Sequence, residues 1–571
     1  MPRTMPPGSA KANRWCGQAP ERYAYGMPLH SRLVAAWVIL TLAGCSSLPP
    51  QGPEKDKTYA ITVLHTNDHH GRFWHNRDGE YGMAARKTVV DAIRSEVAAA
   101  GGYSLLLDGG DVNTGVPESD LQDAVPDFKG MNLLGYDAMA VGNHEFDKSP
   151  AVLAMQRQLA QFPLLSANIY AGGRRLFEPY KIFNLGGVRV AVIGMTTDDT
   201  RKMANPENIR GLEFRSPLQE AAQVVPEARA QADIVIAATH MGHYENGNHG
   251  TQAPGDVEMA RAVAGIDLVV GGHTQNPACM RAENVLDRAY VPGTPCQPDR
   301  QNGTWIVQAH EWGKYVGRAD FQYRNGTFTL VRYTLIPINL KHAVTSADGQ
   351  TELQRYAPAI AENREMLQLL QPYQDFGQQK LLVDVGRSDT RLEGTRALVR
   401  RQPTDLGILI GEAMREKTRA DFAVVNAGGI RDSLPAGTIS YKDILKVHPF
   451  GNTLVTLDLT GREVLDYLAH VVQISPGSGG FPHFAGIRLR IAAGAVREAS
   501  IQGAPIDPAK TYRMAIHQFM AVGGDGYPAM TGHPSYVNTG FVDADVLRGY
   551  IAAHSPLQAA RFAPGDSVVR N

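Results

Sequence analysis

Short apolar runs alternate with longer stretches of helical character in the first half of this 571-residue chain. Each run is too short for a typical helix but long enough for a buried strand. Strands that alternate with helices are typical of layered α/β folds, in which helices cover the faces of a sheet. We therefore predict an α/β fold whose strands include 61–64, 105–107, 138–141, 188–193, 234–238 and 266–270.

Length and composition indicate more than one globular domain. A chain of 571 residues exceeds the size at which a single hydrophobic core stops growing. Its 43% hydrophobic and 20% charged residues are typical of ordinary globular proteins. The formal net charge of -1 gives no global field that would attract nucleic acid or an anionic membrane surface. Nucleic acid is therefore not an expected partner, and a phosphate-binding site would have to be local.

Changes in composition divide the chain into segments. Asn325-Gly326, between two apolar stretches, predicts a β-hairpin near the end of the first domain. Apolar residues at roughly helical spacing in the charged, Gln-rich stretch 351–370 predict a connecting helix, interrupted at Pro358. A helix from Thr404 and a capping-box pattern at Thr460–Glu463 indicate a second α/β unit. The predicted segments are a signal peptide (1–44), a tether (45–57), a first domain (58–342), a linker helix (343–378) and a second domain (379–565).

The N-terminal segment indicates export. The apolar run 34–44 is shorter than the roughly 20 residues that span a bilayer, and Arg32 precedes it. We interpret it as the apolar part of a signal peptide. Met27 is a more usual start for such a segment, which would make residues 1–26 the result of a mis-called start. The ending Leu-Ala-Gly-Cys45 resembles a bacterial lipobox, which implies a lipid on Cys45 and an outer-membrane location facing the periplasm or the cell surface. The alternative is an ordinary signal peptide that carries a cysteine near its end.

Cys279 and Cys296 form a separate pair in the first domain. In an oxidising compartment such a pair is expected to form a disulfide. Closing a loop of this size stabilises a fold by about 3 kcal/mol in the chain-entropy model. Zinc ligation is the alternative, but two isolated cysteines make a poor zinc site.

Polar side chains gather directly after five of the predicted strands. Loops at the carboxyl ends of strands build the sites of layered α/β folds, so these side chains can converge on one point. Carboxylate, imidazole and amide ligands without thiolate favour Zn, Mn or Co. Asp111, which follows two glycines, is predicted to bridge two divalent cations about 4 Å apart. Asp68, His70 and Gln275 would complete one metal site, and Asn143, His240 and His273 the other.

Any one of these residues has an ordinary alternative: Asp68 could be a turn residue, His240 a buried histidine and Asn143 a left-handed turn former. Together and in this order, the motifs resemble the calcineurin-like metallophosphoesterases. Segments 66–71, 142–147 and 271–275 are similar to bacterial 5′-nucleotidases, and most of the mature chain resembles the periplasmic UDP-sugar hydrolase/5′-nucleotidase branch. The resemblance implies the same seven metal ligands, a four-layer first domain and a second α/β domain that binds substrate. The lipobox distinguishes this chain from the soluble members of the family. This difference affects the predicted location and not the predicted chemistry.

His144 and Asp147 resemble the catalytic pair of that family. A carboxylate can fix the orientation of an imidazole and favour its protonated form. His144 could then stabilise charge on the phosphoryl oxygens or assist the leaving oxygen. The alternative is that His144 is one more metal ligand.

The second domain is expected to supply specificity. Arginine suits bidentate contact with phosphate, and two aromatic rings can sandwich a nucleobase, although surface arginines and core phenylalanines are the ordinary alternatives. The resemblance implies that these positions form the nucleoside pocket, with the arginines facing phosphate. The predicted residues are Arg396, Arg400 and Arg431 for phosphate, Phe450 and Phe519 for stacking, Asn452 for the base edge and Asp525 for the ribose hydroxyls.

These features predict an exported two-metal phosphohydrolase for nucleotide scavenging. It would cleave nucleoside 5′-monophosphates to nucleoside and phosphate, and also UDP-sugars to UMP and sugar 1-phosphate. The alternatives are a 2′,3′-cyclic nucleotide phosphodiesterase of the same fold and a catalytically silent nucleotide-binding surface lipoprotein. The complete ligand set and the His144/Asp147 pair favour the enzyme. Expected partners are nucleotide substrates and a membrane through the lipid anchor only, and the chain is expected to be monomeric.

Overall fold

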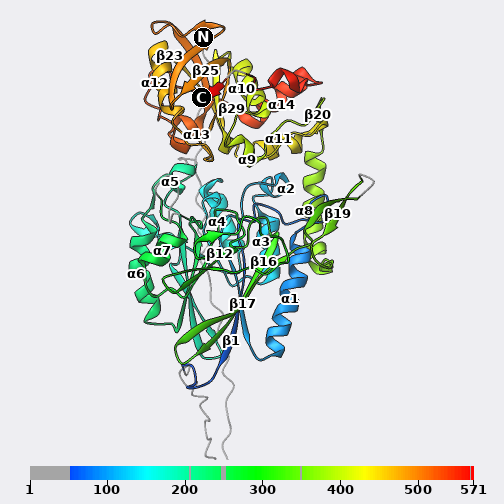
Figure 1. The fold of residues 1–571 in the computed structure, drawn as a ribbon, viewed down its shortest axis with the longest axis vertical. Coiled ribbons are helices and arrows are strands. Elements are labelled where there is room, and N and C mark those ends of the chain that lie inside the picture. The colour runs from blue at the N-terminus through cyan, green and yellow to red at the C-terminus, as the bar shows by residue number, and fades with distance from the viewer. Residues whose placement is uncertain (1–51, 205–207, 246–252, 347–349, 566–567, 571) are drawn as a thin grey trace, which may run out of the picture. The chain divides into compact units, whose positions relative to one another are not determined.

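The computed structural model describes residues 52–204, 208–245, 253–346, 350–565 and 568–570, whose elements are labelled in Figure 1. Within these ranges no helix is long and apolar enough to cross a membrane. The predictions about the signal peptide and Cys45 concern residues outside the described ranges.

Two six-stranded sheets form the first half of the described chain. The first has the order β17-β16-β1-β2-β3-β4, with β1 to β4 parallel, and the second has the order β14-β15-β11-β10-β8-β7, with β15, β11, β10 and β8 parallel. The remaining strands of each sheet pair antiparallel. The bounds are β1 (Tyr59–Thr66), β2 (Tyr103–Asp108), β3 (Ala138–Ala140), β4 (Leu164–Leu165), β16 (Tyr315–Arg324) and β17 (Thr327–Pro337), then β7 (Tyr180–Leu185), β8 (Val188–Thr196), β10 (Ile234–His240), β11 (Leu268–Val270), β14 (Asp299–Gln301) and β15 (Thr304–Val307).

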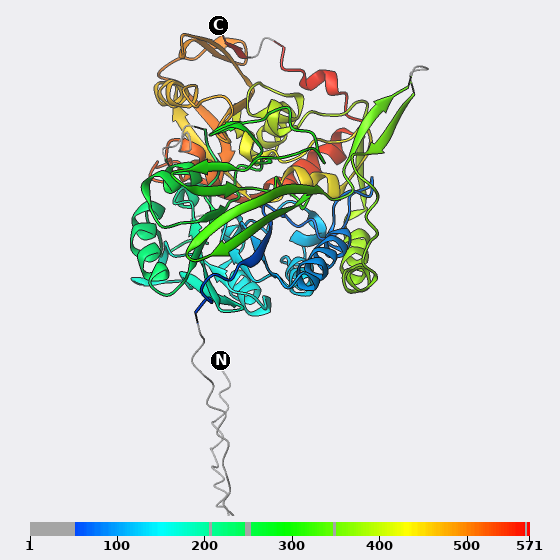
Figure 2. The same cartoon turned by 60° about the horizontal axis from the view of Figure 1, so that its bottom comes forward.

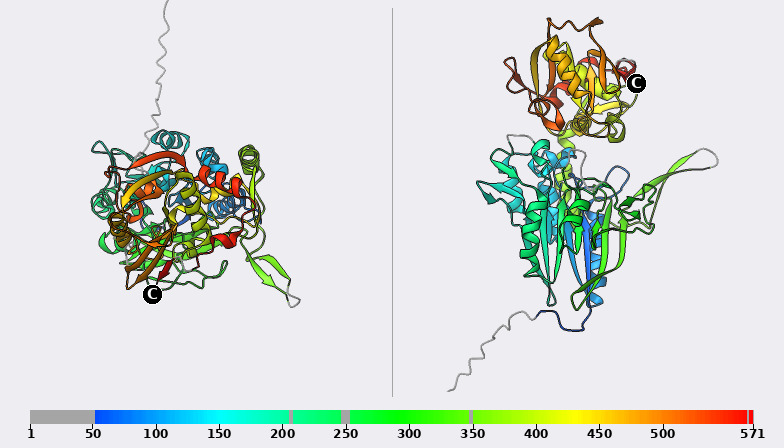
Figure 3. Two further views of the ribbon diagram at one scale, coloured as in Figure 1. Left: turned by 90° about the horizontal axis from the view of Figure 1, so that it is seen from above. Right: turned by 60° about the vertical axis from the view of Figure 1, so that its left-hand side comes forward.

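Helices cover the outer face of each sheet, so this half has four layers (Figure 3, right). Successive strand residues point to opposite faces: Leu106 of β2 packs towards the helices, whereas Leu105 and Leu107 face the other sheet. Strands buried on both faces are apolar throughout, which is why the runs were visible in the sequence. The predicted α/β fold is confirmed. The covering helices are α1 (Met83–Ala99), α3 (Val125–Leu134) and α4 (Pro150–Leu159) on the first sheet, and α6 (Pro217–Arg229) and α7 (Asp256–Ala262) on the second.

The predicted hairpin and disulfide are both present in this half. Asn325 and Gly326 join β16 to β17 with φ angles of 48° and 84°, the left-handed backbone that a two-residue hairpin turn requires. Cys279 and Cys296 are disulfide-bonded and buried in the core between the two sheets. Smaller elements are α2 (Pro117–Asp120), α5 (Thr200–Met203), β5 (Ile169–Ala171), β6 (Arg174–Arg175), β9 (Leu212–Phe214), β12 (Met280–Ala282) and β13 (Val285–Leu286).

The predicted linker helix is wrong in its first part. β18 (Lys341–Thr345) and β19 (Thr351–Arg355) form an antiparallel hairpin that extends away from the sheets in Figure 2. β-branched residues suit this extended backbone, and Pro358 disfavours helix in the residue before it. The connecting helix, α8 (Arg364–Leu381), begins only where the Asn363 side chain accepts a hydrogen bond from the Met366 N–H at 3.0 Å.

The second half contains a five-stranded sheet of order β24-β21-β28-β23-β29, covered by helices on one face and by helices together with a smaller four-stranded sheet on the other. The predicted helix from Thr404 is α10 (Asp405–Thr418), and the capping box of Thr460 and Glu463 opens α12 (Gly461–Val471). The strands are β21 (Phe422–Asn426), β23 (Thr453–Thr460), β24 (Pro482–Ala485), β28 (Thr511–His517) and β29 (Val537–Val542). Around them lie α9 (Arg396–Val399), α11 (Tyr441–Val447), α13 (Gln518–Ala521), α14 (Asp543–His554), β20 (Asp384–Ser388), β22 (Gly437–Ser440), β25 (Ile487–Ala492), β26 (Ala495–Ile501), β27 (Ala504–Pro505) and β30 (Val568–Arg570).

Candidate active site

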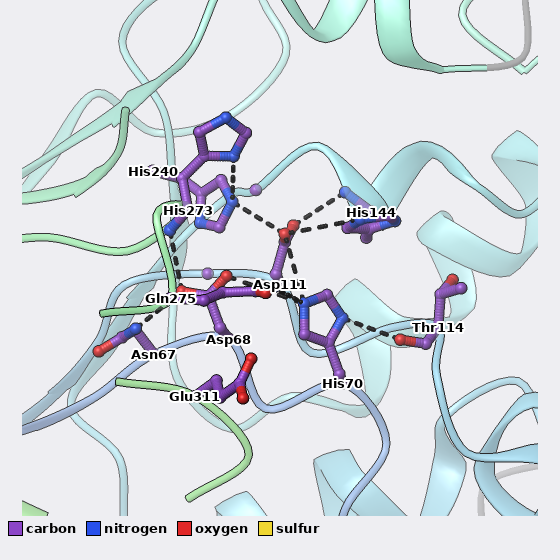
Figure 4. Close-up of polar contacts among 12 residues, drawn as sticks. Asn67, Asp68, His70, Asp111, Thr114, His144, His240, His273, Gln275 and Glu311 are labelled. Carbon is purple, nitrogen blue, oxygen red and sulfur yellow. Dashed lines mark hydrogen bonds and ion pairs between the residues drawn. The ribbon is translucent and has the colours of Figure 1, made fainter. Parts of the chain in front are cut away.

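The predicted metal ligands follow the carboxyl ends of five parallel strands. β1, β2 and β3 belong to the first sheet, and β10 and β11 belong to the second. The loops after these strands meet around Asp111, with His70 and His144 on one side of it and His240 with His273 on the other (Figure 4). The fold therefore brings together side chains that are up to about two hundred residues apart in sequence, such as His70 and Gln275, whose Nε2 atoms lie 2.7 Å apart.

Asp111 lies at the centre of this cluster and is buried. Its Oδ2 is 2.9 Å from His240 Nε2, 3.9 Å from His70 Nε2 and 4.0 Å from His144 Nε2. The backbone N–H of His144 donates to Asp111 Oδ1 at 2.9 Å, which fixes the rotation of the carboxylate. One carboxylate thus faces imidazoles from three loops.

Hydrogen bonds to backbone carbonyl oxygens orient the imidazoles. His70 Nδ1 lies 2.8 Å from Thr114 O, and His240 Nδ1 lies 2.7 Å from Gly109 O. An Nδ1–H that donates to a carbonyl leaves Nε2 with a free lone pair, the arrangement typical of metal-bound histidine. Both Nε2 atoms point into the cluster (Figure 4).

Two oxygen atoms of the cluster have no hydrogen-bond partner within the described part of the chain. They are Asp68 Oδ1, which lies 3.8 Å from His70 Nε2, and Asn143 Oδ1. Buried polar atoms are almost always paired, because leaving one unpaired costs about 1–3 kcal/mol. Spacings near 4 Å are too long for hydrogen bonds and suit two ligands of one cation. The oxygen and nitrogen donors therefore fit divalent metal ions.

The backbone of this cluster is strained. Five of the seven predicted ligands, all except Asn143 and His240, have φ between 51° and 78°. Non-glycine residues adopt this left-handed conformation only where the surrounding structure enforces it, and such residues concentrate at functional sites. Gly142 is also required here, since a Cβ at this position would collide with Asp111 Oδ1.

The charges in the cluster depend on one another. Burial raises the pKa of Asp68 to about 6. Burial also disfavours the charged form of Asp111, but the imidazoles of His240 and His144 hold the pKa of that carboxyl well below its usual range. Against the effect of burial, the Asp111 carboxylate raises the pKa of His240 to about 10. Positive charge at the centre of the site is therefore strongly favoured.

His144 and Asp147 form a hydrogen-bonded pair beside the cluster. His144 Nδ1 lies 2.5 Å from Asp147 Oδ2, so the carboxylate fixes the ring. Burial works against the charged imidazole, but the carboxylates of Asp147 and Asp111 raise the pKa of His144 above its ordinary value. The ring also stacks on Phe450, with centroids 5.9 Å apart and planes inclined by 12°.

A pocket of about 660 Å³ opens over the cluster. All seven substrate residues predicted in the second half line it, together with His144, Asp147 and the proposed ligands Asp111, Asn143, His273 and Gln275. Asp68, His70 and His240 lie deeper and are buried.

The arginines make one wall of this pocket positive. Burial and the neighbouring guanidinium groups lower the pKa of Arg400 to about 9 and that of Arg431 to about 10. Arg431 lies over the ring of Phe450, 5.5 Å from its centroid. Arg396 Nη1 contacts Gln275 Oε1, so this wall touches the metal cluster. Several cations in close proximity favour an anionic ligand.

Sequence reasoning missed three residues of the site. Glu145 is fully buried, and its carboxylate accepts hydrogen bonds from the N–H groups of Gly142 at 2.7 Å and Val112 at 2.9 Å, which ties the second and third ligand loops together. Asn426 donates to Asp525 Oδ2 at 2.7 Å, and Tyr244 lines the pocket. Glu145 could have been noticed as a carboxylate inside a ligand motif, whereas Asn426 and Tyr244 have no comparable signal.

Comparisons with known proteins agree with this geometry. The family model for calcineurin-like phosphoesterases matches residues 61–277, and the model for the 5′-nucleotidase C-terminal domain matches residues 384–532. The chain is 57% identical over 539 residues to protein UshA of Escherichia coli (strain K12), covering 93% of this chain and 98% of that protein. It is 54% identical over 550 residues to a 5′-nucleotidase of Vibrio cholerae serotype O1, covering 95% and 99% of the two chains. The crystal structure of a 5′-nucleotidase precursor from Thermus thermophilus superposes with a TM-score of 0.72 at 30% identity, covering 90% of this chain and 99% of that one.

Proposed function

Because the chain belongs to the bacterial 5′-nucleotidase family, as its motifs predict, we propose that it is an exported enzyme that uses two divalent metal ions to release phosphate from nucleoside 5′-monophosphates. Family membership makes it a metal-dependent hydrolase of nucleotides. The pocket supports the proposal that two metal ions act on nucleoside 5′-monophosphates, because a carboxylate–imidazole cluster there faces three arginines and two phenylalanines.

Asp68, His70 and Gln275 would hold one metal ion and Asn143, His240 and His273 the other, with Asp111 between them. Bound divalent ions polarise phosphoryl oxygens and lower the pKa of water. Zinc, manganese and cobalt suit these ligands. The unpartnered oxygens of Asp68 and Asn143 support this assignment.

The protein's own groups would position the substrate and stabilise charge. Arg396, Arg400 and Arg431 would bind phosphate oxygens with their planar guanidinium groups. His144, oriented by Asp147, would donate a hydrogen bond or a proton to an oxygen of the phosphoryl group from Nε2. The bound phosphoryl group would thus lie between the arginines and the metal ions.

The nucleoside would occupy the other end of the pocket. Phe450 and Phe519 would stack on the two faces of the base, an interaction that tolerates every base. Asn452 would bond the base edge. Asp525, which accepts a hydrogen bond from Asn426, would bind the ribose hydroxyls through its carboxylate oxygens.

Cleavage of UDP-sugars to UMP and sugar 1-phosphate is a second proposed activity of the same site. This activity is supported by the size of the pocket, which extends beyond the residues assigned to a mononucleotide. The additional lining residues include Tyr244, Glu245, Asn276 and Arg288. These polar side chains suit the hydroxyls of a sugar and a second phosphate.

A substrate panel tests the proposal. The metal-free enzyme, restored with Zn²⁺, Mn²⁺ or Co²⁺, is assayed with AMP, UDP-glucose and adenosine 2′,3′-cyclic phosphate, and products are separated by chromatography. We expect release of phosphate from AMP and of UMP from UDP-glucose, and no turnover without metal. Faster cleavage of the cyclic nucleotide than of AMP would favour the phosphodiesterase. Nucleotide binding without turnover in every metal would favour the silent binding protein.

A further inference from the structure

A second group of metal-ligating side chains is buried in the second half of the chain. His448 follows α11, His517 ends β28 and Asp543 begins α14. Their side chains are 1%, 1% and 2% exposed, so bulk water does not solvate them. A ring nitrogen of each histidine and a carboxylate oxygen of Asp543 all lie within 4.8 Å of one another.

Most of the polar atoms of this group lack partners. Among the described residues, His448 Nε2, both ring nitrogens of His517 and Asp543 Oδ2 have no hydrogen bond. Another buried histidine of the same half provides a contrast, because His483 Nδ1 accepts from the Thr404 N–H at 3.4 Å and Nε2 lies 2.8 Å from Val399 O. Each unpaired buried polar atom costs about 1–3 kcal/mol, so a cluster that contains several of them favours binding of a further ligand.

The spacing within the group is that of cation ligands. His448 Nδ1 and His517 Nε2 lie 3.8 and 4.0 Å from Asp543 Oδ2. These distances exceed the roughly 3.5 Å beyond which a contact is no longer a hydrogen bond. Two ligands with bonds of about 2.1 Å to one ion lie about 3.4 Å apart in tetrahedral geometry and about 4.2 Å apart when opposed. The proposed ligands of the first half show the same spacing, 3.8 Å for Asp68–His70 and 3.9 Å for Asp111–His70.

One atom of the group has a hydrogen-bond partner that a cation would replace. His448 Nδ1 lies 3.2 Å from Gly429 O, and coordination at this nitrogen would exchange one long hydrogen bond for a metal bond.

The group is directly connected to the walls of the nucleotide pocket. His448 and His517 each precede a pocket phenylalanine, Phe450 and Phe519, by two residues. The Asp543 N–H donates to Asn452 O at 2.9 Å, and Asn452 lines the pocket as well. Two pocket segments that are distant in sequence, one with Phe450 and Asn452 and one with Phe519, therefore meet at these three side chains.

We propose that His448, His517 and Asp543 bind a third divalent cation, with zinc as the best fit, which fixes the pocket segments to one another. Two imidazoles and one carboxylate are a ligand set that Zn²⁺ accepts, and a water molecule can complete its tetrahedron. The role of this cation is structural, because none of its three ligands lines the pocket.

Anomalous scattering from zinc-soaked crystals of the full chain tests the proposal without reference to activity. We expect a peak about 2.0–2.2 Å from the three side chains, in addition to peaks at the Asp111 cluster. A map with peaks at the Asp111 cluster and none between His448, His517 and Asp543 overturns the third site and leaves the proposed function standing. Absence of peaks at the Asp111 cluster would instead contradict the two-metal proposal.

Metal analysis of purified variants provides a second measurement. His517→Gln is expected to bind one zinc equivalent per chain fewer than the wild type after equilibrium dialysis. His483→Gln is the matched control, since it alters a buried histidine whose nitrogens are already bonded, and should retain the wild-type zinc content. Equal zinc content in folded His517→Gln and wild type overturns the proposal. If His517→Gln does not fold, the anomalous map of the wild type decides.

Discussion

Asp111 lies between two groups of potential ligands, and its position explains its proposed role as a bridge. Its two oxygens contact His240 on one side and the His144 N–H on the other, in surroundings that exclude water. The surrounding imidazoles hold it ionised despite burial. A negative charge placed in this way can offset two adjacent cations.

Asp111→Asn should lower metal content and phosphate release together. The substitution keeps the shape of the side chain but removes the charge, and even groups that only support metal ligands affect activity by 10–100-fold. We therefore expect at least about a 100-fold loss of AMP turnover, together with a loss of bound metal measured by elemental analysis. A variant with the wild-type metal content and normal turnover would refute the bridging role.

His144→Ala separates catalysis from metal binding. If His144 acts on the phosphoryl group, turnover should fall by about 10²–10⁴-fold, the range typical of a general acid or a charge-stabilising group, while the metal content of the Asp111 cluster stays unchanged. The exposed His554→Ala variant is a control that should leave both quantities unaltered. Loss of one metal equivalent from His144→Ala would make His144 a ligand instead.

The residues of the site differed in how well the sequence predicted them. The proposed ligands were predictable because each follows an apolar run, and the carboxyl ends of parallel strands meet at one edge. Glu145 was visible as a carboxylate inside a ligand motif, but its role of accepting hydrogen bonds from backbone N–H groups of two loops is revealed only by three-dimensional contact. The left-handed backbone of Asp68, His70 and Asp111 was not predictable either, since it is imposed by packing against local preference.

At the scale of elements, the loop after β3 has almost no freedom. Gly142 packs against Asp111, and the carboxylate of Glu145 binds the N–H groups on both sides of that contact. The Glu145 carboxylate therefore holds the loop against the Asp111 backbone, and the His144 N–H of the same loop orients the Asp111 carboxylate.

Gly142→Ala should displace the Asp111 side chain, because the new Cβ would occupy the position of Oδ1. We expect reduced metal content and at least about a 10-fold loss of AMP turnover in a folded protein. Gly532→Ala is the matched control, since no atom lies within 4 Å of the added methyl group and its effect should be negligible. Circular dichroism verifies folding, and wild-type metal binding by Gly142→Ala would contradict the tight packing.

The linker shows where reasoning from periodicity fails. Apolar residues between Thr351 and Leu370 follow helical spacing, yet 351–355 pair with 341–345 as a hairpin. Leu353 is 52% exposed in this hairpin. Its place in the helical pattern therefore did not indicate a buried helix face. The local signals for the actual start, a capping Asn363 after Pro358, were present in the sequence and outweigh the pattern.

At the scale of the whole molecule, chemistry and recognition are divided between the two halves. The proposed metal ligands come from residues 68–275, whereas the proposed phosphate and base contacts come from residues 396–525. The predicted four-layer architecture and the family are confirmed. They could be predicted because the strand-end motifs that indicate them are local in sequence. The shared pocket could not be derived from spacing, since it depends on contacts between segments more than one hundred residues apart, such as Arg396 with Gln275.

Phe519→Ala should therefore impair recognition and leave the chemistry intact. Stacking of one base contributes about 1–3 kcal/mol, so kcat/KM for AMP should fall by about 5- to 150-fold. Hydrolysis of p-nitrophenyl phosphate, which has no nucleobase, should change little. Phe541→Ala, which alters a partly exposed phenylalanine of the same half, is the control. Equal losses for the two substrates would contradict base stacking at Phe519.

The proposed lipid anchor also concerns the molecule as a whole. Cys45→Ser should release the exported enzyme in soluble form, because stable attachment depends on the acyl chains. Membrane fractionation followed by an AMP assay measures the distribution of activity. An unchanged membrane-bound fraction would contradict lipidation at Cys45.

The contact between Arg396 and Gln275 joins a proposed phosphate ligand to a proposed metal ligand. If Arg396 binds phosphate and Gln275 binds metal, this contact would couple the two events, so that ordering of either side chain helps to order the other. Linkage then requires reciprocity: the factor by which metal tightens nucleotide binding equals the factor by which nucleotide tightens metal binding. The enzyme would hold its metals most firmly when substrate is abundant and exchange them most readily when substrate is scarce.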